Sequence, residues 1–218
     1  MATKKEQQAA AQAAEQTINK TEAFIEKYKK AIIIAVVAII VIIVGAILYN
    51  NYYAAPRAEE ASTELAKAQT LFDNEQFDKA LPAFQKVAAD YGSTDAGNLA
   101  NLYIGLCQAN LGKWQEAANA LESFSDRGDQ MVSPAALGAL GNAYAHLKQL
   151  DKAVETLKKA AKKADNNSLS PTFLIQAGEI LESQGKKAEA LELYQQVKDK
   201  YFQSMQYQTI DQYIERCK

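Results

Sequence analysis

The residue types that perform chemistry in proteins are scarce in this chain. Of its 218 residues one is a histidine, His146, and two are cysteines, Cys107 and Cys217. The sequence has no Cys-x-x-Cys pair, glycine-rich phosphate loop, Gly-x-Ser-x-Gly segment or cluster with metal-ligand spacing. A catalytic His146 would need an ordered carboxylate and a nucleophile, and no pattern supplies them. We therefore expect no catalytic residue, no cofactor, no metal site and no enzyme activity.

Two interpretations of the cysteines remain open. They can pair with each other in an oxidising compartment, although two are too few for a disulfide framework. Alternatively, Cys107 is a small core residue and Cys217 is a free thiol in the C-terminal tail. We favour the second interpretation.

A nine-residue motif occurs four times after residue 75. Its copies are QFDKALPAF (76–84), KWQEAANAL (113–121), QLDKAVETL (149–157) and KKAEALELY (186–194). The fifth residue of each copy is alanine, and these alanines stand 37, 36 and 37 residues apart. A small residue lies twelve positions before each alanine, and a large residue lies four positions after it. The small residues are Ala68, Gly105, Gly141 and Gly178, and the large ones are Phe84, Leu121, Leu157 and Tyr194.

This pattern resembles the tetratricopeptide repeat, whose units of about 34 residues each form a helix, a turn and a second helix. The segment LYIGLCQANLGKWQEAANAL (102–121) matches the family pattern almost throughout. A small residue on each helix lets the two backbones of a unit approach closely where they cross. The resemblance implies a tetratricopeptide-repeat solenoid of about four repeats with a C-terminal capping helix. With an N-terminal transmembrane helix, which the apolar segment described below predicts, the expected fold class is all-α.

The repeats also indicate the domain organisation. We expect four repeats within residues 57–203, beginning near residues 61, 98, 134 and 171, and a capping helix over residues 204–218. Ser133-Pro134 and Ser170-Pro171 resemble a helix N-cap followed by proline at the first helical position. The first and fourth copies depart most from the pattern, as expected of the terminal units of a repeat array.

An apolar segment precedes the repeats. Residues 31–48 read AIIIAVVAIIVIIVGAIL, in which thirteen of eighteen are Ile, Val or Leu. A helix of this length spans about 27 Å, close to the hydrocarbon thickness of a bilayer. Each of these thirteen side chains favours membrane insertion by roughly 0.3–0.6 kcal/mol. We therefore expect a transmembrane signal-anchor helix at residues 31–53, which ends among the interfacial tyrosines Tyr49, Tyr52 and Tyr53.

The charges that flank this segment predict its orientation. Lys27, Lys29 and Lys30 lie directly before it, whereas Arg57 is the first basic residue after it. Lysine and arginine near a span remain in the cytoplasm, so we expect a cytoplasmic tail at residues 1–30. The predicted location is the inner (cytoplasmic) membrane of a bacterium, crossed once, with the repeat domain in the periplasm. The tail is either a topogenic segment or a docking helix for a cytoplasmic partner.

The resemblance also implies where such a domain binds its partners. In this repeat family a groove is lined by the second, fifth, ninth, twelfth and thirteenth residues of each unit. The candidate protein-binding residues among these are Leu65, Phe72, Leu99, Leu102, Leu106, Asn142, His146, Ile175 and Glu179. No lysine or arginine occupies any groove position, which disfavours a partner held by its terminal carboxylate. The leucines either line this groove or pack against neighbouring helices, and the sequence leaves both interpretations open.

The order of these parts resembles the ancillary Sec translocon subunits of the YfgM type. That resemblance implies protein partners: a SecYEG-type translocon, periplasmic chaperones and emerging envelope proteins. The alternative is an adaptor for outer-membrane protein assembly or for cell-wall and cell-division machinery. Residues 57–218 hold 18 Lys and Arg against 22 Asp and Glu, so nucleic acid is not an expected partner.

Overall fold

Every regular element of the described chain is a helix, as predicted. The computed structural model describes the backbone of residues 4–218 and the side chains of residues 15, 19 and 26–218. The contacts divide the chain into two compact units, residues 1–56 and residues 57–218.

The first unit contains α1 (Lys4–Tyr49) and the π-helix η1 (Asn50–Ala54). Within the protein, every Ile, Val and Leu side chain of residues 32–48 is 40–69% exposed. This helical stretch has a mean hydropathy of 3.5 and is long and apolar enough to cross a membrane. Most side chains of the tail lie outside the described residues, so its role as a topogenic segment or docking helix stays a hypothesis.

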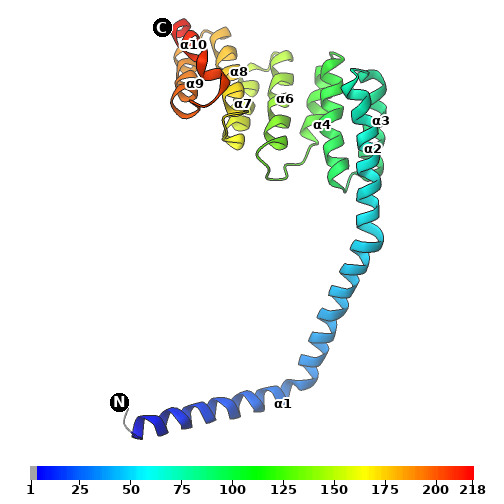
Figure 1. Ribbon diagram of the computed structural model, residues 1–218, viewed down its shortest axis with the longest axis vertical. Coiled ribbons are helices and arrows are strands. Elements are labelled where there is room, and N and C mark those ends of the chain that lie inside the picture. The colour runs from blue at the N-terminus through cyan, green and yellow to red at the C-terminus, as the bar shows by residue number, and fades with distance from the viewer. Residues whose placement is uncertain (1–3) are drawn as a thin grey trace. The chain divides into compact units, whose positions relative to one another are not determined.

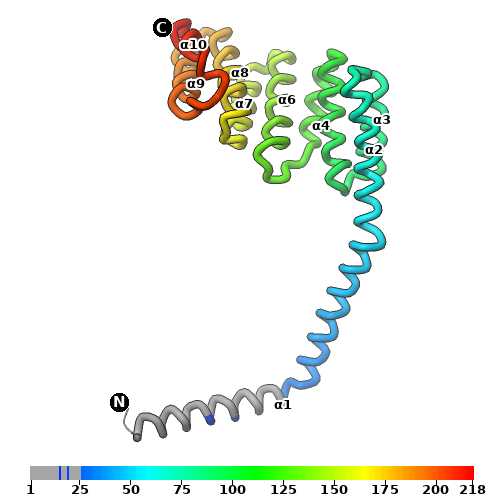
Figure 2. The backbone as a smooth tube through the Cα atoms, in the orientation of Figure 1, coloured from blue at the N-terminus to red at the C-terminus, as the bar shows by residue number. Residues whose placement is uncertain are grey.

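The second unit is a row of helices joined in pairs by short turns (Figure 1). The pairs are α2 (Ala55–Asp73) with α3 (Phe77–Tyr91), α4 (Asp95–Asn110) with α5 (Trp114–Glu122), α6 (Val132–His146) with α7 (Leu150–Ala164), and α8 (Ser170–Ser183) with α9 (Lys187–Lys200). A short 3-10 helix, η2 (Met205–Gln208), and α10 (Ile210–Cys217) follow. From α3 onwards each α-helix packs against the next one in the chain, as the backbone path in Figure 2 shows. The unit is therefore a solenoid of four helix-turn-helix repeats.

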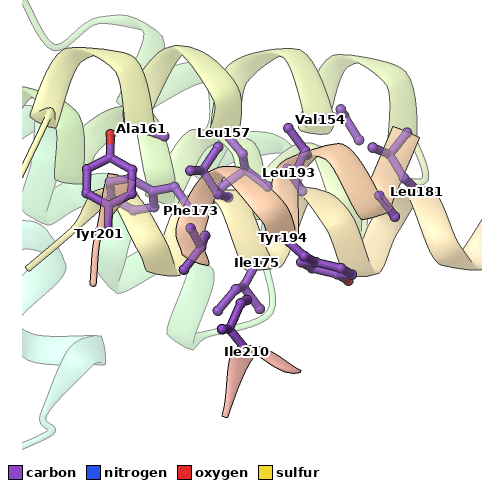
Figure 3. Close-up of a cluster of buried hydrophobic side chains, with 14 of the residues drawn as sticks. Val154, Leu157, Ala161, Phe173, Ile175, Leu181, Leu193, Tyr194, Tyr201 and Ile210 are labelled. Carbon is purple, nitrogen blue, oxygen red and sulfur yellow. The ribbon is translucent and has the colours of Figure 1, made fainter. Parts of the chain in front are cut away.

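Three hydrophobic clusters form the core of this row. The first joins α2, α3 and α4 around the fully buried Phe84. The second extends from α4 to the start of α7 and includes Leu121 and Leu140. The third runs from α7 to α10 and includes Leu157, Tyr194 and Ile210 (Figure 3). Each cluster draws residues from at least two repeats, so each repeat is stabilised by its neighbours.

The small residue of each repeat lies where its two helices cross. The motif alanines are all 0% exposed: Ala80, Ala117, Ala153 and Ala190. A methyl group added to Gly105 would lie 2.5 Å from Cγ of Leu121. A methyl group added to Gly141 would lie 2.7 Å from Cγ of Leu157. These separations are shorter than carbon–carbon contact, so the crossing requires the small residues that the sequence pattern predicted.

The turn inside each repeat contains one residue in the left-handed conformation, always at the same place. Its φ angle is +58°, +76°, +61° and +76° in repeats one to four, at Glu75, Gly112, Lys148 and Gly185 respectively. This conformation costs a residue with a side chain roughly 1–2 kcal/mol, whereas glycine adopts it freely. Repeats one and three therefore carry a strained turn that repeats two and four avoid.

Repeat two has a short second helix. Helix α5 has nine residues, whereas α7 has fifteen, and residues 123–131 form a loop where further helical turns would continue. The buried Asn98 holds this loop through its side-chain amide, which donates to the Ser125 carbonyl at 2.8 Å and accepts from the Ser125 N–H at 2.7 Å. Lys163 of α7 pairs with Asp126 at 2.5 Å. The loop is thus bonded to helices of both adjoining repeats.

The starts of α6 and α8 differ from the sequence prediction. Asp129 accepts hydrogen bonds from the backbone N–H groups of residues 131–133, and its other oxygen accepts the Ser133 hydroxyl. Asn166 accepts two backbone hydrogen bonds before α8. The prediction that Ser133 and Ser170 cap these helices is therefore wrong. Before α6 the capping side chain is that of Asp129, which reaches the N–H groups of Val132 and Ser133 in the first turn. Before α8 the Asn166 side chain instead closes a turn with the N–H groups of Ser168 and Leu169, which precede the helix.

Candidate protein-binding surfaces

The structure separates the predicted binding residues into buried and accessible ones. Leu65, Leu102 and Ile175, at the fifth position of their units, are only 6%, 7% and 8% exposed. The same position in repeat three is Gly138, where an added methyl group would lie 2.2 Å from Cε1 of Phe173. The fifth position thus packs between successive repeats. For these residues the structure favours the packing role over a place in an open groove.

Three other predicted residues keep part of their surface accessible. Leu99 and Leu106 are half-buried and pack against the clusters beside α4. Phe72 is also half-buried, and its ring meets that of Tyr103 edge-on with centroids 5.3 Å apart. The Tyr103 hydroxyl in turn accepts a hydrogen bond of 2.9 Å from Gln69. The side chains of Phe72, Leu99, Tyr103 and Leu106 form a partly exposed apolar rim on repeats one and two.

The last three predicted residues are polar, and two of them are exposed. Asn142 is half-buried, and His146 and Glu179 are exposed. The His146 ring stacks on the indole of Trp114, with centroids 3.6 Å apart and planes inclined by 2°. Trp114 begins α5 and His146 ends α6, so this stack joins repeats two and three. The pair could not be predicted, because nothing in the sequence shows that these two helix ends meet.

The C-terminal segment covers the end of repeat four. Gln206 donates to the Thr172 hydroxyl at 2.9 Å, and Arg216 pairs with Glu182 at 3.0 Å. Thr172 and Glu182 are at the second and twelfth positions of their unit. Helix α10 also packs against α9. Residues 205–217 therefore cover α8 and α9 at the C-terminal end of the row.

Glu182 connects this segment to the core as well. It accepts a hydrogen bond of 2.5 Å from the Tyr194 hydroxyl. Burial, together with this carboxylate, raises the pKa of Tyr194, so the phenol remains a donor at neutral pH. The Tyr194 ring also contacts that of Tyr213 in α10, with centroids 5.3 Å apart.

A second accessible surface lies between the second helices of repeats three and four. A groove of about 730 Å³ separates α7 from α9. Its floor is apolar, and its residues are at most 9% exposed: Val154, Ala161, Leu174, Leu181 and Tyr201. In Figure 3, Leu181 lies beside Val154 at one end, and Tyr201 lies beside Ala161 at the other. The groove thus follows the length of α7.

Polar contacts join α7 to the α9 side at both ends of this groove. At one end Asp151 accepts from Lys186 and Gln184, each at 3.0 Å. At the other end Asp165 pairs with Lys200 at 2.5 Å. The hydrogen bonds from Gln184 and Lys200 are the main reason why the pKa of Asp151 and of Asp165 lies below its usual range. Both carboxylates are therefore charged and engaged at neutral pH.

Lysines line the wall that α7 contributes to the groove. Lys159 pairs with Glu155 at 2.7 Å. Lys158 and Lys162 also line the groove and make no ion pair or hydrogen bond with any residue that the structure describes. The opposite wall carries Glu189, which lacks such a partner among the same residues. No pattern in the sequence predicted this surface.

Both cysteines lie in the core of the repeat domain. Cys107 and Cys217 are both free and buried, so the core role expected of Cys107 is observed, whereas Cys217 lies in α10 instead of a tail. Burial raises the pKa of the Cys107 thiol to about 11, which keeps it protonated and unreactive at neutral pH. Among the described residues, His, Cys, Asp and Glu form no group suited to a metal ion.

Comparisons with known proteins agree with this architecture. Two crystal structures of a Podospora anserina putative kinesin light chain with nearly identical TPR-like (tetratricopeptide-like) repeats align with a TM-score of 0.59 at 17% identity. The alignments cover 73% of this chain and 85% and 86% of theirs, and they show a shared fold alone. No curated protein matches the sequence. Residues 22–215 match the family model of the tetratricopeptide repeat-like domain, and the chain therefore belongs to that family.

Proposed function

We propose that this protein is a membrane-anchored scaffold that binds other proteins and catalyses no reaction. The observation that carries the proposal is an exposed apolar helical segment, residues 31–48, directly followed in sequence by a repeat solenoid. Such solenoids present extended surfaces to protein segments. The apolar segment has the length and composition of a bilayer span.

The proposal assigns residues 1–30 to the cytoplasm and residues 31–53 to the inner membrane of a bacterium. The repeats at 57–203 and the capping segment at 204–218 then lie in the periplasm. The support for this orientation is the lysine cluster before the span, since basic residues near a span stay in the cytoplasm.

Anchoring in the membrane lowers the affinity that such a scaffold needs for its protein partners. A partner held at the same membrane meets the repeats at an effective concentration of about the millimolar range. Weak contacts with the partly exposed rim or with the groove between α7 and α9 are then sufficient.

The finer proposal is that the partner is a SecYEG-type translocon together with periplasmic chaperones. The span would then contact the channel laterally, and the repeats would receive emerging envelope proteins. The translocon proposal rests on the resemblance to the YfgM-type subunits in the order of tail, span and repeats. The alternative is an adaptor for outer-membrane protein assembly or for cell-wall and cell-division machinery, which needs the same anchor and surface.

Purification of the tagged full-length protein in mild detergent tests the proposal, with residues 1–56 alone as the matched control. Translocon subunits that co-purify with the full chain, together with periplasmic chaperones or envelope proteins that co-purify only with the full chain, would support the translocon role. Outer-membrane assembly factors or cell-wall enzymes would support the adaptor role. If the full chain retains no protein beyond those retained by the control, the scaffold proposal is wrong.

A further inference from the structure

The groove between α7 and α9 combines an apolar floor with an excess of free positive charge. Of the acidic residues that line it, Asp151, Glu155 and Asp165 are already paired with lysines of the same groove. Lys158 and Lys162 have no such partner among the described residues. The α7 wall therefore presents two uncompensated positive charges above buried aliphatic and aromatic side chains.

This local charge contrasts with the rest of the repeat domain. Residues 57–218 hold more acidic than basic residues, 22 against 18. A ligand with carboxylates is repelled by much of this surface and attracted to the α7 wall. Charge complementarity of this kind selects the partner and its orientation.

We propose that the groove between α7 and α9 binds an acidic, amphipathic helical segment of a partner protein. This inference rests on the proposed scaffold function and adds to it a site and a class of partner. Apolar side chains of the segment would lie in the groove against the small accessible parts of Val154, Leu181 and Tyr201, at most 9% of each residue, and its carboxylates would meet Lys158 and Lys162.

The dimensions of the groove fit such a segment. The groove follows α7 from Asp151 to Asp165, which corresponds to about 21 Å of helix. A ligand helix of about fourteen residues has the same length. Lys158 and Lys162 are one helical turn apart, with Cβ atoms roughly 6 Å apart, so they match glutamates spaced by four residues on the ligand.

Glu189 determines which edge of the ligand is acidic. It lies on the α9 wall, has no ion-pair partner among the described residues, and repels carboxylates there. The glutamates of the ligand must therefore run along α7, and the edge beside α9 must be neutral or basic. A segment with glutamates on both edges would bind less well than one with glutamates on a single edge.

Binding of a designed probe to the full-length protein in nanodiscs tests the proposal. The probe is a fluorescein-labelled fourteen-residue helical peptide with leucines on one face and glutamates along one edge, and its binding is followed by fluorescence polarisation. The variant Lys158→Glu/Lys162→Glu should bind the probe about tenfold more weakly than the wild type. The matched control Lys79→Glu/Lys113→Glu makes the same change in net charge at exposed lysines of repeats one and two, and it should bind within twofold of the wild type.

Altered probes separate the contributions of charge and of apolar contact. A probe with glutamine in place of glutamate, or serine in place of leucine, should bind the wild-type protein more weakly. A probe with lysine in place of glutamate should bind Lys158→Glu/Lys162→Glu more tightly than it binds the wild type. This exchange of specificity requires a folded variant, so it also excludes misfolding as the cause of weaker binding.

Four results would overturn the inference. The first is equal binding of the acidic probe to the wild type and to Lys158→Glu/Lys162→Glu, and the second is an equal loss in the control variant. The third is self-association of the wild type in analytical ultracentrifugation that Lys158→Glu/Lys162→Glu abolishes, because the groove would then belong to a second copy of the chain. If the charge-reversed variant still co-purifies the partners of the wild type, the scaffold function stands and this groove is not its site.

Discussion

Gly141 provides the most direct test of the close helix crossing. Alanine at this position adds a Cβ atom 2.7 Å from Cγ and 3.0 Å from Cδ2 of Leu157. Favourable carbon–carbon contacts begin near 3.5 Å, so α6 and α7 must separate or the leucine must leave its rotamer. Overpacking costs about 1–3 kcal/mol, and two carbon atoms at 3.0 Å or less place this site in the upper part of that range, at about 2–3 kcal/mol. The higher helix propensity of alanine offsets about 1 kcal/mol of this cost. We expect a net loss of about 1–2 kcal/mol in the free energy of unfolding.

Thermal unfolding of the full-length protein in detergent, followed by far-UV circular dichroism, measures this loss. A domain of this size changes its midpoint by about 2–4 °C per kcal/mol, so Gly141→Ala should lower it by about 2–8 °C. Leu157→Ala removes the clashing atoms and leaves a cavity that costs about 2–5 kcal/mol by itself. In that background Gly141→Ala should be neutral or stabilising.

This reversal of sign is the signature of a direct contact between the two positions. If the Gly141→Ala protein melts at or above the wild-type midpoint, the predicted steric cost at the helix crossing is wrong. An equal loss in both backgrounds would show that the effect does not come from Leu157. Lys148→Gln, an exposed change in the following turn, should shift the midpoint by less than about 2 °C.

Other expected outcomes concern orientation, turns and acid stability. A reporter active only outside the cytoplasm should be active when fused after residue 218. Glutamates in place of the three lysines before the span should reduce that activity. If a reporter active only in the cytoplasm is active at the same place instead, the predicted orientation is wrong. Glu75→Gly and Lys148→Gly should each stabilise the domain by about 0.5–1 kcal/mol by relieving a left-handed turn, and a lower midpoint would contradict this. The Ser133 hydroxyl and the backbone N–H groups hold the pKa of Asp129 at about 2, below the usual 3.8, so its contribution is complete above pH 4 and lost as the pH falls through 2. The stability difference between the wild type and Asp129→Ala should shrink over that range, and a constant difference would exclude the carboxylate charge as its source.

The repeats could be predicted because their signal is local and periodic. Each crossing needs a small residue at a fixed distance before an alanine, and the pairing of Gly141 with Leu157 lies within one repeat. The sequence therefore contains the whole contact, and four copies of it exclude coincidence. The apolar segment was equally predictable, because length and composition alone decide whether a helix can span a bilayer.

Features that depend on contacts between repeats could not be predicted in this way. The groove positions of the repeat family placed Leu102 in a binding groove, but the packing of one repeat against the next buries this fifth position of the unit. At Gly138, the fifth position of repeat three, the ring of Phe173 fills the space beside the glycine. The early end of α5 depends on a loop that Asn98 holds from another helix. The run KKAAKKA (158–164) was visible in the sequence, but only the position of α9 shows that it borders a groove.

The contacts that residues 205–217 make with repeat four have a consequence for assembly. Each repeat of a solenoid offers the next one the same kind of surface, and such a head-to-tail surface, if open, permits another molecule to continue the array without closure. Here Gln206 and Arg216 already occupy Thr172 and Glu182 at that surface. We therefore expect the C-terminal segment to protect the protein against end-to-end polymerisation, and a variant that lacks it should form open oligomers, which analytical ultracentrifugation would detect.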